Sequence, residues 1–450
     1  MSIAPEKQRE LEIKLAVLAD DLEYWTGVTK DGAKFEKHHS QVGRVAAQLT
    51  AAKSALETEA QEAVAAASSD LFRPLLSDAL DLHRLWEFFR SKLAQRLAPN
   101  FVEYLEAADE FAWDVYRPVV TMAGATRREP PLTFFSTEPT PFAMWRDRSY
   151  QFALGGVVPR RREAADIVKT LPVPMIGMPW VQLGHVPDLL FLAHEVGHEV
   201  EEELRLTKAI DAAVKSAVTA PLQQAAWRSW GGETFGDVYG TLAAGPEFTR
   251  HLLALTLTGS NVAEQRRTAK EWGTYPTAAL RVLVSIAVLK ASSFAKTGAD
   301  IERDWRGRIA AHPMQTFEAV IVPIVESLLA LPLPNGHRLA DLEPFTPADD
   351  ERVEEGAAAL LDDEAPDVTT VRQAVAAAAR AFRTDSAAYV SAKAHERTLK
   401  KILAIRTPGV LHDTEAARDS VRQHAESDRH AGAGVLSAMR KIRVRSANVQ

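Results

Sequence analysis

The sequence contains no cysteine among its 450 residues. Disulfide bonds and thiolate metal ligands are therefore excluded, and any metal site must be built from histidine and carboxylate side chains. Basic residues are also in the minority, since 53 Lys and Arg against 60 Asp and Glu give a net charge of −7. This balance argues against a general nucleic-acid-binding protein, so we expect no nucleic-acid partner.

Long apolar runs are missing as well. The closest approach to one, residues 278–289, is interrupted by Arg281 and is shorter than the roughly 18 residues that a membrane-spanning helix needs. The N-terminus leads into charged residues without the apolar centre of a secretion signal. We therefore expect no membrane segment and a cytoplasmic protein.

The most informative stretch is residues 191–200, which read Phe-Leu-Ala-His-Glu-Val-Gly-His-Glu-Val and contain the pattern H-E-x-x-H. Apolar residues recur around it at helical spacing, which predicts a helix. Residues four apart lie on one helix face, so His194 and His198 can direct two imidazole nitrogens at one ion. Glu195, beside that face, can take a proton from a metal-bound water, as a general base does in amide hydrolysis.

A catalytic zinc site needs a third protein ligand and an open fourth position. Residues 231–240 read Gly-Gly-Glu-Thr-Phe-Gly-Asp-Val-Tyr-Gly, in which Glu233 and Asp237 form a carboxylate pair one helical turn apart. The glycines of this segment would let two helices approach closely around a metal. An H-E-x-x-H motif followed some tens of residues later by E-x-x-x-D on a second helix resembles the gluzincin metallopeptidases, the group that includes thermolysin.

The resemblance is limited to residues of about 185–245. It implies that Glu233 is the third ligand of a zinc ion bound by His194 and His198. It further implies that Asp237 accepts a hydrogen bond from a ligand imidazole and fixes the tautomer of that ring. These assignments predict a zinc cofactor.

Two related zinc patterns fit less well. The metzincin motif would require glycine at 201 and histidine at 204, where this chain has Glu201 and Leu204. Aspzincins use a D-x-x-Y-G pattern, whereas the segment 237–240 is one residue shorter. Asp237 as the third ligand is therefore a weaker alternative to Glu233.

The resemblance also implies a donor that stabilises the oxyanion of the reaction, because some gluzincins use a histidine, tyrosine or arginine downstream of the ligands. Tyr275, Arg281 and His251 are the candidates here, in that order, and Tyr239 is a fourth. His185, just before the motif helix, can either line the cleft or cap the helix.

Two other polar features are interpreted as exposed to solvent. The adjacent His38 and His39 diverge by about 100° on a helix and cannot readily share an ion. The three glutamates at 201–203 are interpreted as the solvated end of the motif helix.

The segment 124–182 differs from the helical remainder because it is rich in proline and contains the β-favouring runs 132–135 and 173–178. We predict a small sheet whose strands the prolines confine to edges. An exposed edge just before the metal helix is where zincin-like enzymes pair an extended peptide by strand addition.

These patterns predict a mainly α-helical fold with a zincin-like catalytic core at 124–300, which holds the small β-sheet and the active-site helix. Helical regions at 1–123 and 301–406 flank the core, and the charged segment 407–450 is expected to be a mobile tail.

The predicted function is that of a zinc-dependent metallopeptidase with a peptide or protein substrate. A helical scaffold or interaction protein with a structural or vestigial metal site is one alternative, and a zinc amidohydrolase that acts on a non-peptide amide is another. Turnover separates the scaffold from both enzymes, and the choice of substrate separates the two enzymes from each other.

Overall fold

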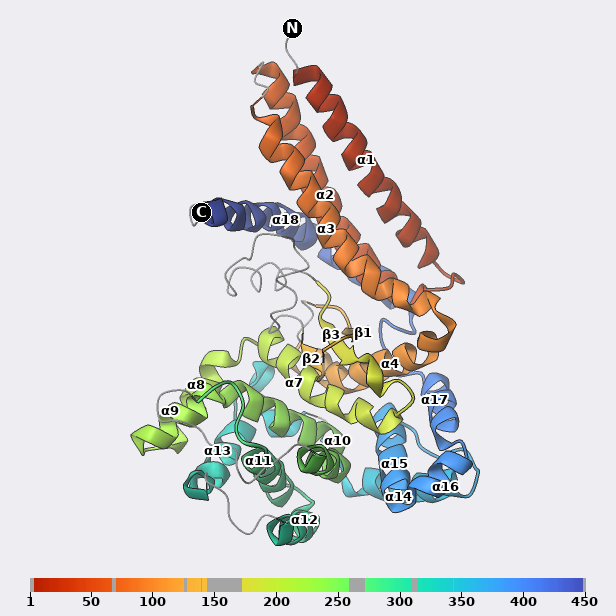
Figure 1. The fold of residues 1–450 in the computed structure, drawn as a ribbon, viewed down its shortest axis with the longest axis vertical. Coiled ribbons are helices and arrows are strands. Elements are labelled where there is room, and N and C mark those ends of the chain that lie inside the picture. The colour runs from red at the N-terminus through yellow and green to blue at the C-terminus, as the bar shows by residue number, and fades with distance from the viewer. Residues whose placement is uncertain are drawn as a thin grey trace.

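The computed structural model describes residues 4–66, 70–124, 128–138, 140–143, 172–258, 272–308, 315–342 and 344–447. These residues form a mainly α-helical protein with one small sheet, as the sequence predicted (Figure 1). None of the helices in these ranges is long and apolar enough to cross a membrane.

The elements follow in chain order. The N-terminal helices are α1 (Ala4–Val28), α2 (His39–Ala65), α3 (Phe72–Ala94) and α4 (Pro99–Ala123), and the strands are β1 (Leu132–Ser136), β2 (Phe142–Ala143) and β3 (Met175–Pro179). The short helix η5 (Val186–Phe191) leads into α7 (Leu192–Glu203), α8 (Thr207–Ala217), α9 (Pro221–Ser229), α10 (Gly231–Thr258), α11 (Ala278–Lys290) and α12 (Ala295–Arg308). The remaining helices are α13 (Ile321–Leu329), α14 (Pro347–Leu361), α15 (Val371–Thr384), α16 (Ser386–Ser391), α17 (Ala394–Ala404) and α18 (Thr414–Ala447).

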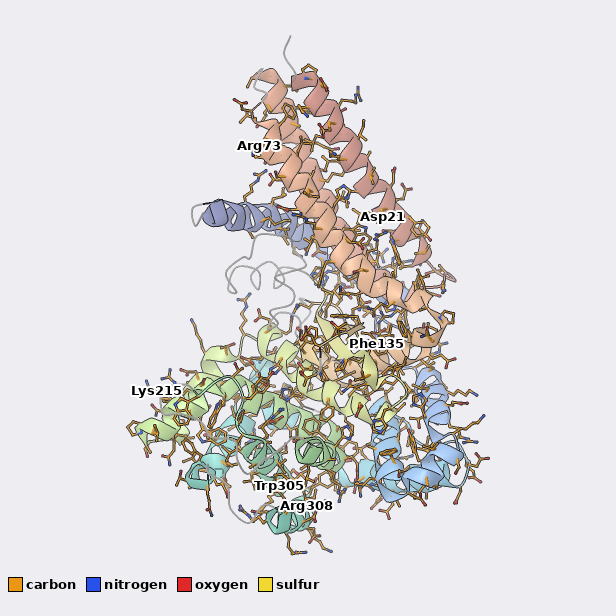
Figure 2. The ribbon with its side chains drawn as sticks, viewed as in Figure 1. Asp21, Arg73, Phe135, Lys215, Trp305 and Arg308 are labelled. Carbon is orange, nitrogen blue, oxygen red and sulfur yellow. The ribbon has the colours of Figure 1, made fainter. Side chains whose placement is uncertain are left out.

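Two hydrophobic cores lie on either side of the sheet. One is formed by α1, α2 and α3 with part of α18, and the other joins α4 to the helices from α7 to α17. In Figure 1 the first three helices form an elongated bundle above the larger helical body, with the strands at the junction. Alternate residues of β1 serve the two cores, because Phe134 packs into the first and Phe135, labelled in Figure 2, into the second.

This division differs from the boundaries expected from the sequence. Helix α4 was assigned to the N-terminal region 1–123, but its buried residues, among them Phe111 and Tyr116, belong to the larger core. The helices of 301–406 contribute to that same core rather than forming a separate one. Packing of α4 against α7 and of α15 against α10 joins these regions around the H-E-x-x-H helix.

The sheet has the strand order β1-β3-β2, with β1 parallel and β2 antiparallel to β3. The prediction that prolines confine the strands to edges was wrong for β3, which is central. Pro174 precedes this strand and Pro179 ends it, so neither removes a donor from the middle of the ladder. Among the described strands, the edge strand in contact with the motif helix is β2, and residues 144–171 of the proline-rich segment lie outside the described residues.

The segment predicted to be a mobile tail forms the long helix α18, which packs along α2. Val435, Leu436 and Met439 are buried in the smaller core. Asp428 binds the guanidinium group of Arg44 through both carboxylate oxygens, at 3.0 and 3.1 Å. The prediction failed because this polar helix still carries a few apolar residues that face the bundle, and Asp428 and Arg440 form ion pairs with α2 and α3.

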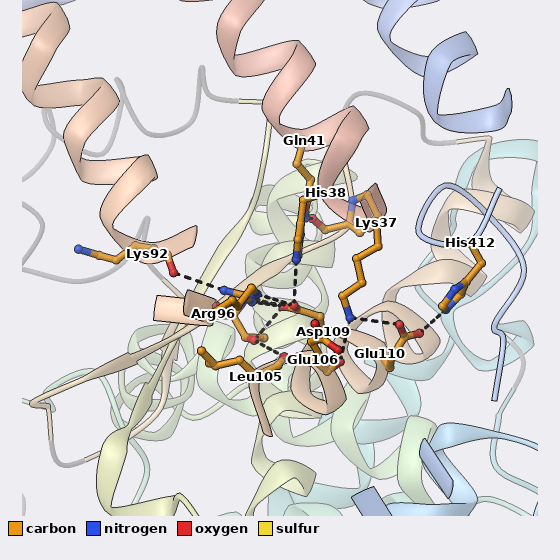
Figure 3. Close-up of polar contacts among 12 residues, drawn as sticks. Lys37, His38, Gln41, Lys92, Arg96, Leu105, Glu106, Asp109, Glu110 and His412 are labelled. Carbon is orange, nitrogen blue, oxygen red and sulfur yellow. Dashed lines mark hydrogen bonds and ion pairs between the residues drawn. The ribbon is translucent and has the colours of Figure 1, made fainter. Parts of the chain in front are cut away.

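His38 lies in a buried polar network at this junction, so the prediction that it is exposed to solvent was wrong (Figure 3). Its Nδ1 lies 2.6 Å from Oε1 of Gln41, and its Nε2 lies 3.8 Å from Asp109. Arg96 donates to both oxygens of Asp109, whose Oδ1 also accepts from the backbone of Thr133 at 2.9 Å. Burial, together with the positive charge of Arg96, lowers the pKa of His38 from 6.5 to about 3.

We expect His38 to make the stability depend on pH. Between pH 6.5 and 3 the unfolded chain binds a proton at this residue that the folded chain does not bind. Its contribution to the free energy of unfolding is complete above pH 6.5 and falls by about 1.4 kcal/mol per pH unit on acidification. His38→Gln removes this contribution, so the difference in unfolding free energy from the wild type, measured in urea, should shrink between pH 7 and 4.

The exposed His430 provides the matched control for this measurement. His430→Gln should keep the pH dependence of the wild type. If the difference between His38→Gln and the wild type stays constant over this pH range, His38 is not the buried neutral group described above.

Candidate metal centre

The predicted ligands come together where α7 packs against α10. His194 and His198 lie one turn apart on α7, so both rings face the same neighbour. Glu233 lies in the first turn of α10, and Asp237 follows one turn later. All four side chains are buried in this interface.

Three donor atoms define the centre of the cluster. Nε2 of His194 lies 3.1 Å from Nε2 of His198 and 3.2 Å from Oε2 of Glu233, and Nε2 of His198 lies 3.5 Å from that same oxygen. A tetrahedral zinc ion with bonds of about 2.0–2.1 Å has ligand atoms about 3.3 Å apart. The triangle therefore fits three corners of a tetrahedron around one ion, and its donors suit a divalent metal.

Close packing of the two helices depends on glycine at the point of contact. A Cβ atom at Gly236 would lie 2.6 Å from Cε1 of His194, and a Cβ atom at Gly197 would lie 3.1 Å from Cα of Gly236. Both contacts are shorter than a side chain normally tolerates. The glycines of 231–240 were predicted to allow such an approach, and Gly236 does so, whereas Gly197 was not recognised from the sequence.

Asp237 holds His194 from the side opposite the cluster. Its Oδ1 lies 2.9 Å from Nδ1 of His194, so the carboxylate directs Nε2 of that ring towards Glu233. Arg281 donates to both oxygens of Asp237, at 2.7 and 2.8 Å. Arg281 was predicted as an oxyanion donor, but the structure places it behind the ligand ring, where it positions Asp237.

The electrostatics of the cluster favour a positive charge at its centre. Burial opposes the protonation of His194, but Asp237 and Glu233 raise its pKa to about 9. Burial also opposes the ionisation of Glu233, yet the imidazoles of His198 and His194 hold its pKa well below the usual range. A cation that replaces a proton between the rings meets the same favourable field.

Glu195 connects the motif helix to the sheet. Its Oε2 accepts a hydrogen bond of 2.7 Å from the backbone N–H of Ala143 in β2. Because this N–H points to Glu195 and not to β3, the carboxylate lies along the outer edge of the sheet. The predicted general base is thus adjacent in sequence to the candidate ligand His194 and in contact with the strand that was expected to guide a peptide.

The other predicted oxyanion donors lie in different surroundings. Tyr275 is half exposed, and its ring centre lies 5.8 Å from the guanidinium carbon of Arg281. Tyr239 donates from its hydroxyl to the carbonyl of Val115 in α4, at 2.7 Å, and so ties α10 to α4. Tyr239 therefore has a structural role, and Tyr275 keeps its place as a predicted donor.

His185 and His251 form a separate cluster at the start of the motif helix. Both rings lie 3.1 Å from Oδ1 of Asp188 in η5. The structure does not bring them into the group formed by His194, His198 and Glu233. The sequence did not identify Asp188 as a partner of His251, because the two residues meet only where α10 packs against η5.

The glutamates at 201–203 do not form the solvated helix end that the sequence suggested. Glu201 and Glu203 are buried, and only Glu202 is half-buried. Oε1 of Glu201 accepts from the hydroxyl of Thr207 at 2.8 Å, and its Oε2 lies 3.9 Å from Nδ1 of His198. The position of Glu201, three residues after His198, is the signal that could have identified this contact.

No family model, curated protein or solved structure matches the chain. The features that point to a function are the geometry of this centre and the H-E-x-x-H motif that forms it.

We expect the purified protein to bind one zinc ion per chain. Elemental analysis should find zinc in the wild type and markedly less in Glu233→Ala, which lacks one of three converging donors. Because a ligand that binds only the folded state stabilises it, zinc should raise the melting temperature of the wild type. Equal zinc content in the two proteins would show that Glu233 is not a zinc ligand.

The close contact at Gly236 can be tested separately. Gly236→Ala should displace the ring of His194 and weaken zinc binding by about 10-fold or more, as lost ligand support does in other metal sites. Gly307→Ala in α12 is the matched control, because no atom lies within 4 Å of a Cβ at that position. Competition with a chromophoric chelator measures both dissociation constants, and equal values would show that His194 does not depend on this glycine.

Proposed function

We propose that this protein is a zinc-dependent metallopeptidase of the gluzincin type. The observation that carries the proposal is the triangle of His194, His198 and Glu233, with Glu195 next to it on the same helix. A structural zinc site has four protein ligands, whereas a catalytic one has three and an open position. The described residues supply three, which favours catalysis over the scaffold alternative.

The donor set of two imidazoles and one carboxylate suits zinc. When bound, zinc polarises a carbonyl group and makes water a nucleophile near neutral pH. Asp237 holds the ring of His194 in the tautomer that leaves Nε2 free to bind, and Arg281 holds Asp237. Together they limit the movement of one ligand before substrate arrives.

Glu195 is the proposed general base. Its carboxylate takes the proton of the attacking water and then gives it to the nitrogen of the leaving amine, so the residue returns to its initial state. The hydrogen bond from Ala143 fixes one of its oxygens and leaves the other as the proton acceptor. Tyr275 is the proposed donor to the oxyanion, although its half-exposed ring must then turn towards the cluster.

A peptide substrate is favoured over a small amide because β2 is an edge strand in contact with Glu195. The backbone groups of this edge other than the Ala143 N–H would pair with an extended peptide and bring a scissile bond past the general base. A non-peptide amide would make no use of this edge.

Glu195→Gln tests the proposal directly. The amide cannot take up the proton, so the turnover of zinc-loaded protein on a peptide library should fall by about 10²–10⁴-fold. Zinc content should stay at the wild-type value, because Glu195 is not a ligand. Glu202→Gln, on the same helix and half-buried, should cleave as fast as the wild type.

The outcomes distinguish the alternatives. Cleavage by the wild type that a chelator abolishes and zinc restores supports the peptidase. Zinc binding with no cleavage of peptides or small amides would favour the scaffold. Full activity in Glu195→Gln would exclude Glu195 as the base.

A further inference from the structure

The two ligand imidazoles differ in how their second nitrogen is satisfied. Nδ1 of His194 has the carboxylate of Asp237 at 2.9 Å. Nδ1 of His198 is buried and has no hydrogen-bond partner among the described residues. A neutral imidazole that binds a metal through Nε2 carries its proton on Nδ1, so this buried N–H requires an acceptor.

Glu201 is in the position to supply that acceptor. It lies three residues after His198 on α7, so the two side chains share a face of the helix. Its Oε2 lies 3.9 Å from Nδ1 of His198, beyond the hydrogen-bonding distance of about 2.7–3.2 Å. Only 2% of its side chain is exposed, so water has little access to the carboxylate.

The chain turn after α7 holds Glu201 in this position. Arg205 adopts a left-handed conformation with φ of 55°, and the backbone N–H of Leu206 donates to the carbonyl of Glu201 at 2.8 Å. The turn brings Thr207, the first residue of α8, back to the carboxylate, where its hydroxyl donates to Oε1 at 2.8 Å. One oxygen is thus anchored while the other faces His198.

We propose that Glu201 is a positioning residue for the metal centre, which accepts the Nδ1 proton of His198 as Asp237 accepts that of His194. A small rotation of the His198 ring closes the 3.9 Å gap and keeps Nε2 directed at Glu233. The inference rests on the metal site proposed above but not on peptide hydrolysis. Each ligand imidazole then has a carboxylate behind it, one from the facing helix and one from its own.

The test is the zinc affinity of variants of the full chain, measured by competition with a chromophoric chelator. Glu201→Ala should weaken zinc binding by about 10- to 100-fold, as the loss of such a partner does in other sites. Glu201→Gln, which keeps an amide oxygen as acceptor, should weaken it less. Thr207→Val should also weaken zinc binding because it removes the hydroxyl that donates to Oε1 of Glu201, whereas Thr207→Ser should retain the wild-type affinity.

Glu202→Gln is the matched control and should bind zinc like the wild type. A melting curve of each apoprotein separates positioning from simple stabilisation, because a purely structural role for Glu201 would lower the melting temperature without changing the dissociation constant. Unchanged zinc affinity in both Glu201→Ala and Glu201→Gln would overturn the inference. Failure of the wild type to bind zinc would instead remove the proposed metal site itself.

Discussion

The approach of two imidazole nitrogens to 3.1 Å inside a buried helix interface is the constraint on which the site depends. Two ring nitrogens at this distance, beside a carboxylate, are stable only with a proton or a metal ion between them. The four-residue spacing on α7 brings the two rings together, and the close approach of α7 and α10 that Gly197 and Gly236 allow brings Glu233 to them. The packing of α7 against α10 therefore brings together the donor atoms that could bind a cation.

Charged side chains around this centre alternate in sign from Arg281 to Asp237 and then to the ring of His194. Arg281 of α11 neutralises Asp237, which in turn supports His194, so a positive charge from the far side of α10 stabilises a buried carboxylate. Glu195 is directed at the sheet, where it accepts a hydrogen bond from Ala143 of β2, whereas His194 and His198 face α10. The two histidines of the candidate metal centre and the proposed base thus share α7 but contact different neighbours.

Several sequence interpretations failed for a common reason, which is that a polar residue was judged by its type and not by its partners. His38 is buried because Gln41 of α2 bonds to its ring, and because Asp109 of α4, paired with Arg96 just after α3, lies next to it. Helix α18 is docked because Asp428 finds Arg44 across the bundle. Asp109 and Asp428 are each distant in sequence from the residue that they meet, so no local pattern reveals these contacts.

The sequence by itself determined the helical class, the small sheet and the three residues that converge on one point. Helical periodicity and a fixed four-residue spacing are local properties of the chain, and they hold wherever the helix lies. Only the tertiary structure decided that Arg281 stands behind Asp237 and that β3 is the central strand. Those relations depend on how separate elements pack, and packing is set by shape and buried charge across long distances in the chain.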